Sequence, residues 1–143
     1  MKKAASIHLR RGKFYVDTES RTKAGIWVGV GAVQIVDEGN DIALAEALRS
    51  ALEASQHGIP TPPPDDDLTI SILEAAGVKT WRAFVRDATC VDAKLSDGRV
   101  TLTPYRKVDR AGNYVPIPEK AQTIRLASEE LGTIVRSVFD DAG

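Results

Sequence analysis

The stretch Val91-Asp92-Ala93-Lys94-Leu95-Ser96-Asp97-Gly98-Arg99-Val100-Thr101-Leu102 decides the fold class of this chain. Apolar and polar residues alternate before Asp97-Gly98 and again after it, which is the two-residue period of a β-strand. Asp-Gly supplies the positive φ angles that a type I′ turn requires. With this two-residue loop, Leu95 faces Val100 and Ala93 faces Leu102, so all apolar residues share one face. The sequence therefore predicts an antiparallel hairpin buried on one side.

Strand signals also fill the first 36 residues. Ile7 and Leu9 alternate with polar residues, residues 14–17 follow a turn at Arg11-Gly12, and a β-branched run at 26–36 follows a turn at Ala24-Gly25. This order predicts a three-stranded meander.

The next segment has the spacing of a helix. Leu44, Leu48 and Leu52 recur every fourth residue after a capping residue, Asn40 or Asp41, which predicts an amphipathic helix ending near Gly58. Four prolines in residues 59–64 predict an extended loop, because proline lacks a backbone donor and fixes φ. Residues 65–67 then precede a short helix around Ile72 that Gly77 stops.

The end of the chain combines short strands with a last helix. Two prolines make residues 114–118 an edge strand at best, and a further short strand is expected at residues 122–126. Ser128 is expected to cap a final helix with acids in its first turn. Apolar residues recur in it at helical spacing, at Leu131, Ile134, Val135, Val138 and Phe139.

The order of these elements predicts one α+β domain over residues 1–143. It lacks the regular strand–helix alternation of a doubly wound parallel sheet, so we expect a mostly antiparallel sheet with about three helices packed mainly on one face. With 143 residues, of which 43% are hydrophobic, such a domain can bury a core without disulfides.

Composition and charge exclude several classes of protein. The net charge of -1 gives no overall basic field for nucleic acid or acidic lipid, and the single Cys90 allows no internal disulfide. The N-terminal segment begins with lysines, as a signal peptide does, but Arg10, Arg11 and Lys13 follow before the apolar segment of a signal peptide could develop. No run approaches the length of a membrane span. We therefore expect a cytoplasmic protein with no membrane partner.

No assembled catalytic, metal or cofactor motif is present in the sequence. His8 and His57 have no metal-ligand spacing with Cys90, and Gly29-Val30-Gly31 lacks the third glycine of a dinucleotide fingerprint, which favours a bulge or a close backbone approach. We expect no enzyme, no cofactor and no obligate small molecule. An enzyme built only by folding, with Asp92 or His8 near the hairpin, stays open as an alternative.

Charge is unevenly distributed along the chain. Residues 1–25 carry seven Lys/Arg against two acids, whereas residues 37–67 carry eight acids against Arg49 alone. If the acids share a surface, they form an anionic patch that would steer a basic protein toward it; a merely solvated helix and loop is the alternative. The candidate binding residues are Asp37, Glu38, Asp41, Asp65, Asp66 and Asp67.

Four short segments carry a resemblance to a known family. They are Arg21-Thr22-Lys23-Ala24-Gly25-Ile26-Trp27-Val28-Gly29, Thr80-Trp81-Arg82-Ala83-Phe84, Asp97-Gly98-Arg99-Val100 with Pro104, and Gly112-Asn113-Tyr114-Val115-Pro116. Their order resembles the CdiI immunity proteins of bacterial contact-dependent growth inhibition. Aromatics, glycines and prolines of this kind set turns and packing, so the segments identify a scaffold and no catalytic signature.

The resemblance implies an antidote that binds the C-terminal toxin domain of its cognate CdiA effector, commonly a nuclease, inside the producing cell. Such inhibition is stoichiometric, and each antidote matches its own toxin, so the resemblance carries over no contact residues. Nucleic acid is not an expected partner. The alternative is a small nucleic-acid-binding module, in which basic residues surround the aromatic Phe14 and Tyr15. These basic residues are Lys2, Lys3, Arg10, Arg11 and Lys13.

Overall fold

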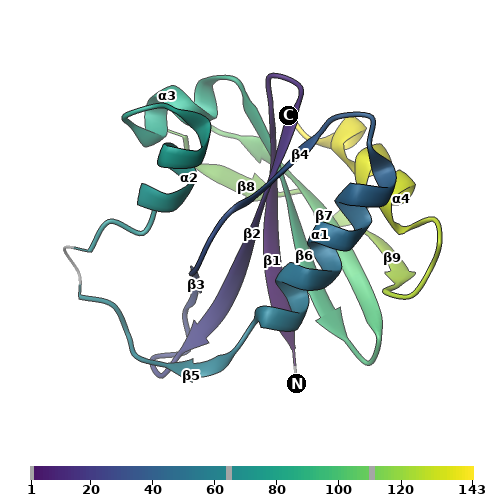
Figure 1. Ribbon diagram of the computed structural model, residues 1–143, viewed down its shortest axis with the longest axis horizontal. Coiled ribbons are helices and arrows are strands. Elements are labelled where there is room, and N and C mark those ends of the chain that lie inside the picture. The colour runs from purple at the N-terminus through teal and green to yellow at the C-terminus, as the bar shows by residue number, and fades with distance from the viewer. Residues whose placement is uncertain (1, 64–65, 110–111) are drawn as a thin grey trace.

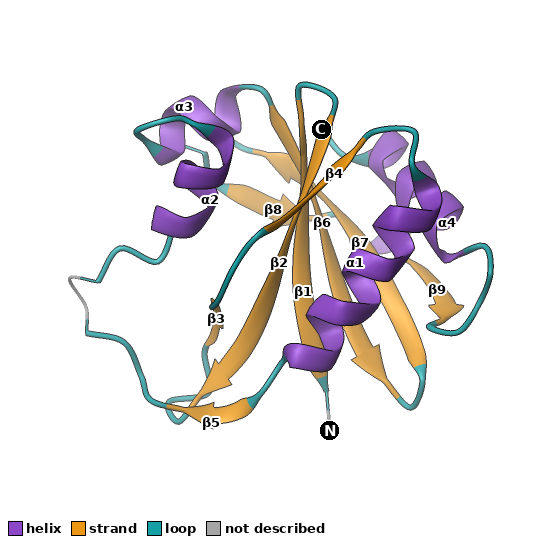
Figure 2. Cartoon of the chain, viewed as in Figure 1, coloured by secondary structure: helices purple, strands orange, loops and turns teal. Residues whose placement is uncertain are grey.

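The computed structural model describes residues 2–63, 66–109 and 112–143, and they form one curled, mostly antiparallel sheet with helices on both of its faces (Figures 1 and 2). The strands in this part of the chain are β1 Lys3–Arg10, β2 Lys13–Thr22, β3 Trp27–Gly29, β4 Gln34–Asp37, β5 His57–Ile59, β6 Ala88–Ser96, β7 Arg99–Lys107, β8 Tyr114–Pro116 and β9 Gln122–Arg125. The α-helices are α1 Asp41–Ala54, α2 Ile70–Ala76, α3 Trp81–Arg86 and α4 Leu131–Val138, and two 3-10 turns lie at Pro118–Lys120 and Phe139–Asp141. The predicted α+β class is confirmed.

The strand order is β3-β2-β1-β6-β7-β8, with β4 and β5 also paired to β2 and β9 paired to β7. Every pairing is antiparallel except the short parallel contact of β2 with β5. Strand β8 lies at the edge, as its prolines predict.

The β6–β7 hairpin has the register that its sequence predicts. Leu95 pairs with Val100 and Ala93 with Leu102. The turn residues Asp97 and Gly98 have φ angles of 52° and 73°, which is the left-handed pair that a type I′ turn requires. Ala93, Val100 and Leu102 are fully buried, so this hairpin forms the floor of the main core.

Helices α1 and α4 cover one face of the sheet and enclose that core. Leu44, Leu48 and Leu52 are fully buried, and the Asn40 side chain caps α1 by accepting from the Ala43 N–H at 3.1 Å. The predicted end near Gly58 is wrong, because α1 ends at Ala54. There the Ser55 hydroxyl donates to the Glu19 carbonyl and accepts from the Ala4 N–H, which directs the chain into β5.

A second, smaller core lies on the opposite face and was not predicted. Successive strand residues point to opposite faces, so Ile7 belongs to the main core while its neighbour His8 contacts Trp81 and Phe84. These aromatic residues come from α3, a short helix capped by the Thr80 hydroxyl, which accepts from the Ala83 N–H at 3.1 Å. Helices α1 and α4 thus pack on one face of the sheet, as expected. Helices α2 and α3 instead cover one end of the other face.

Two other boundaries differ from the sequence expectations. The expected strand at residues 26–36 is split into β3 and β4, because the chain turns at Gly31, whose φ is 85°, and both pieces pair with different parts of β2. The last helix begins at Leu131. Ser128 lies before it, in a turn where its hydroxyl accepts from the Glu130 N–H at 3.1 Å. No helix in the described residues is long and apolar enough to span a membrane.

Candidate functional site

Three of the predicted binding residues gather at the turn from β4 into α1. The Asp37 carboxylate lies 3.4 Å from Lys13 Nζ in an exposed ion pair, and Glu38 is exposed beside it. Asp41 has a structural role, because Arg136 of α4 donates to it at 3.0 Å. That guanidinium hydrogen bond lowers the pKa of Asp41. Asp37 and Glu38 are therefore the more available charges of this group.

The other predicted acids lie elsewhere. Asp66 and Asp67 belong to the long loop that leads into α2, on the far side of the molecule from the start of α1 (Figure 1). Asp67 accepts from both the N–H and the hydroxyl of Thr69, at 2.9 and 2.6 Å, and these bonds lower its pKa. Asp65 lies outside the described residues. The predicted acids within the described residues thus fall into two groups and form no single continuous patch.

A third acidic group was missed from the sequence. Asp17 and Glu19 of β2 and Asp92 of β6 lie on the sheet face opposite α1 and α4, beyond the part that α2 and α3 cover. Lys94 contacts Asp92 at 3.3 Å and lies 5.0 Å from the centre of the Trp27 ring. Acids two residues apart in a strand share a face, so their spacing in β2 was the available signal.

Burial changes the protonation of these carboxylates. It raises the pKa of Asp17 to about 6, and burial together with the adjacent Asp92 raises the pKa of Glu19 to about 7. Burial also raises the pKa of Asp92. The charge of this sheet face therefore changes close to neutral pH. Gly29 of β3 approaches it so closely that a Cβ there would lie 2.5 Å from Asp17 Oδ2, which confirms the close backbone approach expected at this glycine.

His8 and Cys90 face the same side of the sheet as neighbours in the β1–β6 register. Burial lowers the pKa of His8 to about 4 and raises the pKa of the Cys90 thiol. The imidazole is thus held neutral among aromatic rings and the thiol is held protonated, which is the opposite of an activated nucleophile. Among the described residues, no group of three His, Cys, Asp or Glu has the geometry to hold a metal ion.

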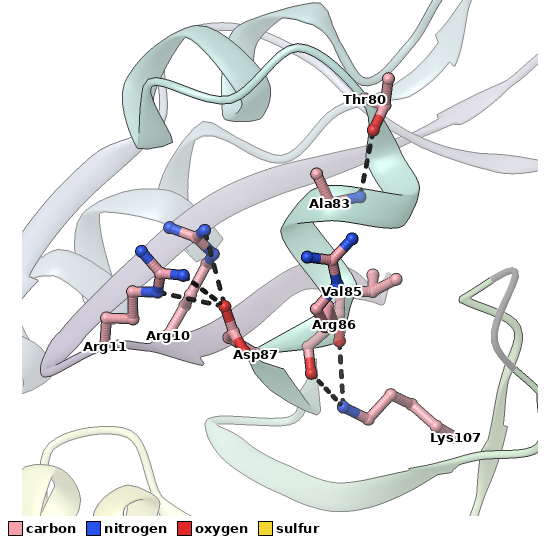
Figure 3. A network of polar contacts seen from close by, with 8 residues as sticks. All are labelled: Arg10, Arg11, Thr80, Ala83, Val85, Arg86, Asp87 and Lys107. Carbon is pink, nitrogen blue, oxygen red and sulfur yellow. Dashed lines mark hydrogen bonds and ion pairs between the residues drawn. The ribbon is translucent and has the colours of Figure 1, made fainter.

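The basic residues near the β1–β2 turn are tied to the protein itself (Figure 3). Arg10 is buried beside the Phe84 ring, and Arg11 donates to Asp87 at 2.8 Å. Lys107 donates to the Val85 and Arg86 carbonyls at the end of α3, at 2.9 and 3.3 Å.

The aromatic residues within this basic segment are also unavailable. Phe14 is 0% exposed and Tyr15 is 4% exposed, because they fill the two cores on opposite faces of the sheet. The nucleic-acid alternative needed these rings as stacking platforms for bases, and that interpretation is wrong for Phe14 and Tyr15.

Comparison with known proteins gives one family and a common fold. The family model described as CdiI, CDI immunity protein, matches residues 3–142. A protein of unknown function, NMB0488, from Neisseria meningitidis superposes with a TM-score of 0.82 at 18% identity, covering 100% of this chain and 96% of that one. A chain of the CdiA-CT/CdiI toxin and immunity complex from Yersinia pseudotuberculosis gives 0.76 at 19% identity, with coverages of 100% and 98%. No curated protein sequence matches the chain.

Proposed function

The chain belongs to the CdiI family of CDI immunity proteins, as its short segments predicted, and we propose that it binds and neutralises the C-terminal toxin domain of a cognate CdiA effector. The observation that carries this proposal is the family match over residues 3–142. The fold shared with a chain of a toxin and immunity complex supports it. The protein would act inside the producing cell by stoichiometric binding, without turnover.

We further propose that the toxin is a nuclease and that exposed carboxylates of the antidote contact it. A nuclease that grips phosphate presents Lys and Arg side chains, and carboxylates pair with the same groups. Asp37 and Glu38 at the start of α1 are well placed for this role, because both are exposed.

Co-expression tests the proposal directly. The toxin domain encoded beside this gene is induced with and without the chain, and cell survival, co-purification and nucleic-acid integrity are scored. Protection together with a one-to-one complex and intact nucleic acid is the expected result. Protection from a toxin that cuts no nucleic acid would refute the nuclease assignment and would still support the antidote function. Cell death without a complex would refute the antidote itself.

Charge-removing variants test the acidic contacts. Asp37→Asn with Glu38→Gln should slow association with the toxin at low salt, and the effect should shrink as salt screens it. The matched control is Glu74→Gln with Glu119→Gln, which removes the same charge from exposed positions on α2 and in the Pro118–Lys120 turn. Equal association rates for the two double variants would reject the Asp37 and Glu38 contact.

A further inference from the structure

An open groove of about 850 Å³ runs between α1 and α4 on the outside of the main core. Its apolar lining includes Ile42 and Ala45 of α1, Leu126 of the segment after β9, and Gly132 of α4. At Gly132 a Cβ would overlap the Asp41 carbonyl, so glycine lets α4 approach the first turn of α1 closely. The groove thus lies beside a close backbone contact between the two helices.

Ile42 lies at the edge of this groove and is 77% exposed, the largest exposed fraction among the big hydrophobic side chains of the described residues. It stands three residues before Ala45 and four before Glu46, so the three share one face of α1. Exposed apolar surface of this kind, rimmed by polar residues, is typical of protein-binding sites.

The walls of the groove are fixed by hydrogen bonds. Arg49 of α1 donates through Nε to the Leu126 carbonyl at 2.9 Å and through Nη2 to the Ser128 carbonyl at 2.8 Å. Arg136 of α4 holds Asp41 at the other end. A groove with anchored walls is formed before its partner arrives, so binding loses little entropy in ordering it.

The rim carries two carboxylates, those of Glu46 and Glu129, that have no ion-pair partner among the described residues. Asp41 is paired with Arg136, and the guanidinium of Arg49 keeps its charge but uses its donors on the two carbonyls. A partner segment that brings an apolar side chain flanked by Lys or Arg would match this arrangement, and an acidic segment would be repelled.

We propose that the groove between α1 and α4 is the docking site for the toxin domain, receiving an apolar side chain against Ile42 and Ala45 while flanking basic side chains pair with Glu46 and Glu129. This inference rests on the proposed antidote function and assigns it a surface. It also places the contact beside Asp37 and Glu38 at the start of α1, and away from Asp66 and Asp67.

The test measures binding of a catalytically inactive toxin domain to purified variants. Ile42→Ser should weaken the dissociation constant at least tenfold, because central apolar contacts dominate such interfaces. Ile70→Ser is the matched control, since Ile70 on α2 is 49% exposed and lies on the other face. It should change the dissociation constant less than twofold. Both side chains are solvent-exposed, so the variants are expected to fold, and thermal melting checks this.

A second variant tests the rim independently. Glu46→Lys with Glu129→Lys should lower the association rate about tenfold at low salt, with a smaller effect at high salt. Unchanged affinity for Ile42→Ser and unchanged association for the charge reversal, with a wild type that still binds, would overturn the groove and leave the antidote function standing. If the wild type itself does not bind, both proposals fail together. A homodimer in light scattering that Ile42→Ser dissolves would assign the groove to a second copy and overturn the proposal.

Discussion

Replacing Gly132 by alanine probes the contact on which the packing of α1 against α4 depends. A Cβ at this position would overlap the carbonyl oxygen of Asp41 and lie 2.7 Å from its carbonyl carbon and 3.1 Å from its Cα. These are backbone atoms at the first turn of α1, so no flexible side chain can move aside. The two helices must separate to admit the methyl group.

The size of the effect follows from two opposing terms. Carbon atoms pack best at about 3.5–4.0 Å, so the helices must move apart by about 1 Å, and such overpacking costs about 1–3 kcal/mol. Alanine is the better helix former by about 1 kcal/mol, which offsets part of this cost. Because the clash is with backbone, we place the overpacking cost at its upper end and expect a net loss of about 2 kcal/mol in unfolding free energy.

Urea unfolding followed by the fluorescence of Trp27 and Trp81 measures this loss. With a slope of about 2 kcal/mol per molar urea, the midpoint should fall by about 1 M. Ser50→Ala is the control, because Ser50 of α1 is exposed, lies away from α4 in the helix, and also gains helix propensity on replacement by alanine. It should shift the midpoint little. A Gly132→Ala protein as stable as the wild type, or more stable, would refute the close packing of α1 and α4.

Three further predictions concern stability. Asn40→Ala should lower the unfolding free energy by about 1 kcal/mol through loss of the cap on α1, and Asn40→Asp should restore the stability. Equal urea midpoints for the wild type and both variants would show that the cap is not formed. Phe84→Ala should cost about 3–5 kcal/mol because Phe84 is fully buried in the second core, and a calorimetric loss below about 1 kcal/mol would contradict that core. The folded pKa of Glu19 is raised from 4.5 to about 7, so the folded state binds the extra proton, and the stability linked to Glu19 is present below about pH 4.5 and is lost as pH rises through 7. Glu19→Gln should therefore gain stability relative to the wild type between pH 5 and pH 8, and a difference that stays flat with pH would disprove the buried carboxylate.

The sequence predicted the parts of the fold that depend on neighbours along the chain. Alternation and the Asp97-Gly98 turn set the β6–β7 register, and the spacing of Leu44, Leu48 and Leu52 set the buried face of α1. Helix α3 was missed because six residues are too few to display a helical period. The split of residues 26–36 into β3 and β4 was also hidden, since both pieces keep strand-like composition.

The candidate sites depended more strongly on tertiary structure. Runs of acids identified Asp37, Glu38, Asp66 and Asp67, but only the fold shows that the first two lie apart from the last two and that Asp41 is occupied by Arg136. The spacing of Asp17 and Glu19 in β2 puts these two carboxylates on one face, but Asp92 joins them from a strand that β1 separates from β2, so no local pattern unites all three.

By itself, therefore, the sequence determined the class of fold, the buried periodicities, the main turns and the family, because each follows from short-range spacing or from segments in a fixed order. Tertiary structure alone decided which charges are available and where the apolar groove lies. The groove beside Ile42 needs α1, α4 and the segment after β9 to meet, and these elements come from residues 41–54, 131–138 and 126–127. Contacts over such separations arise only when the whole chain has folded, since they depend on the packing of helices that are remote in sequence.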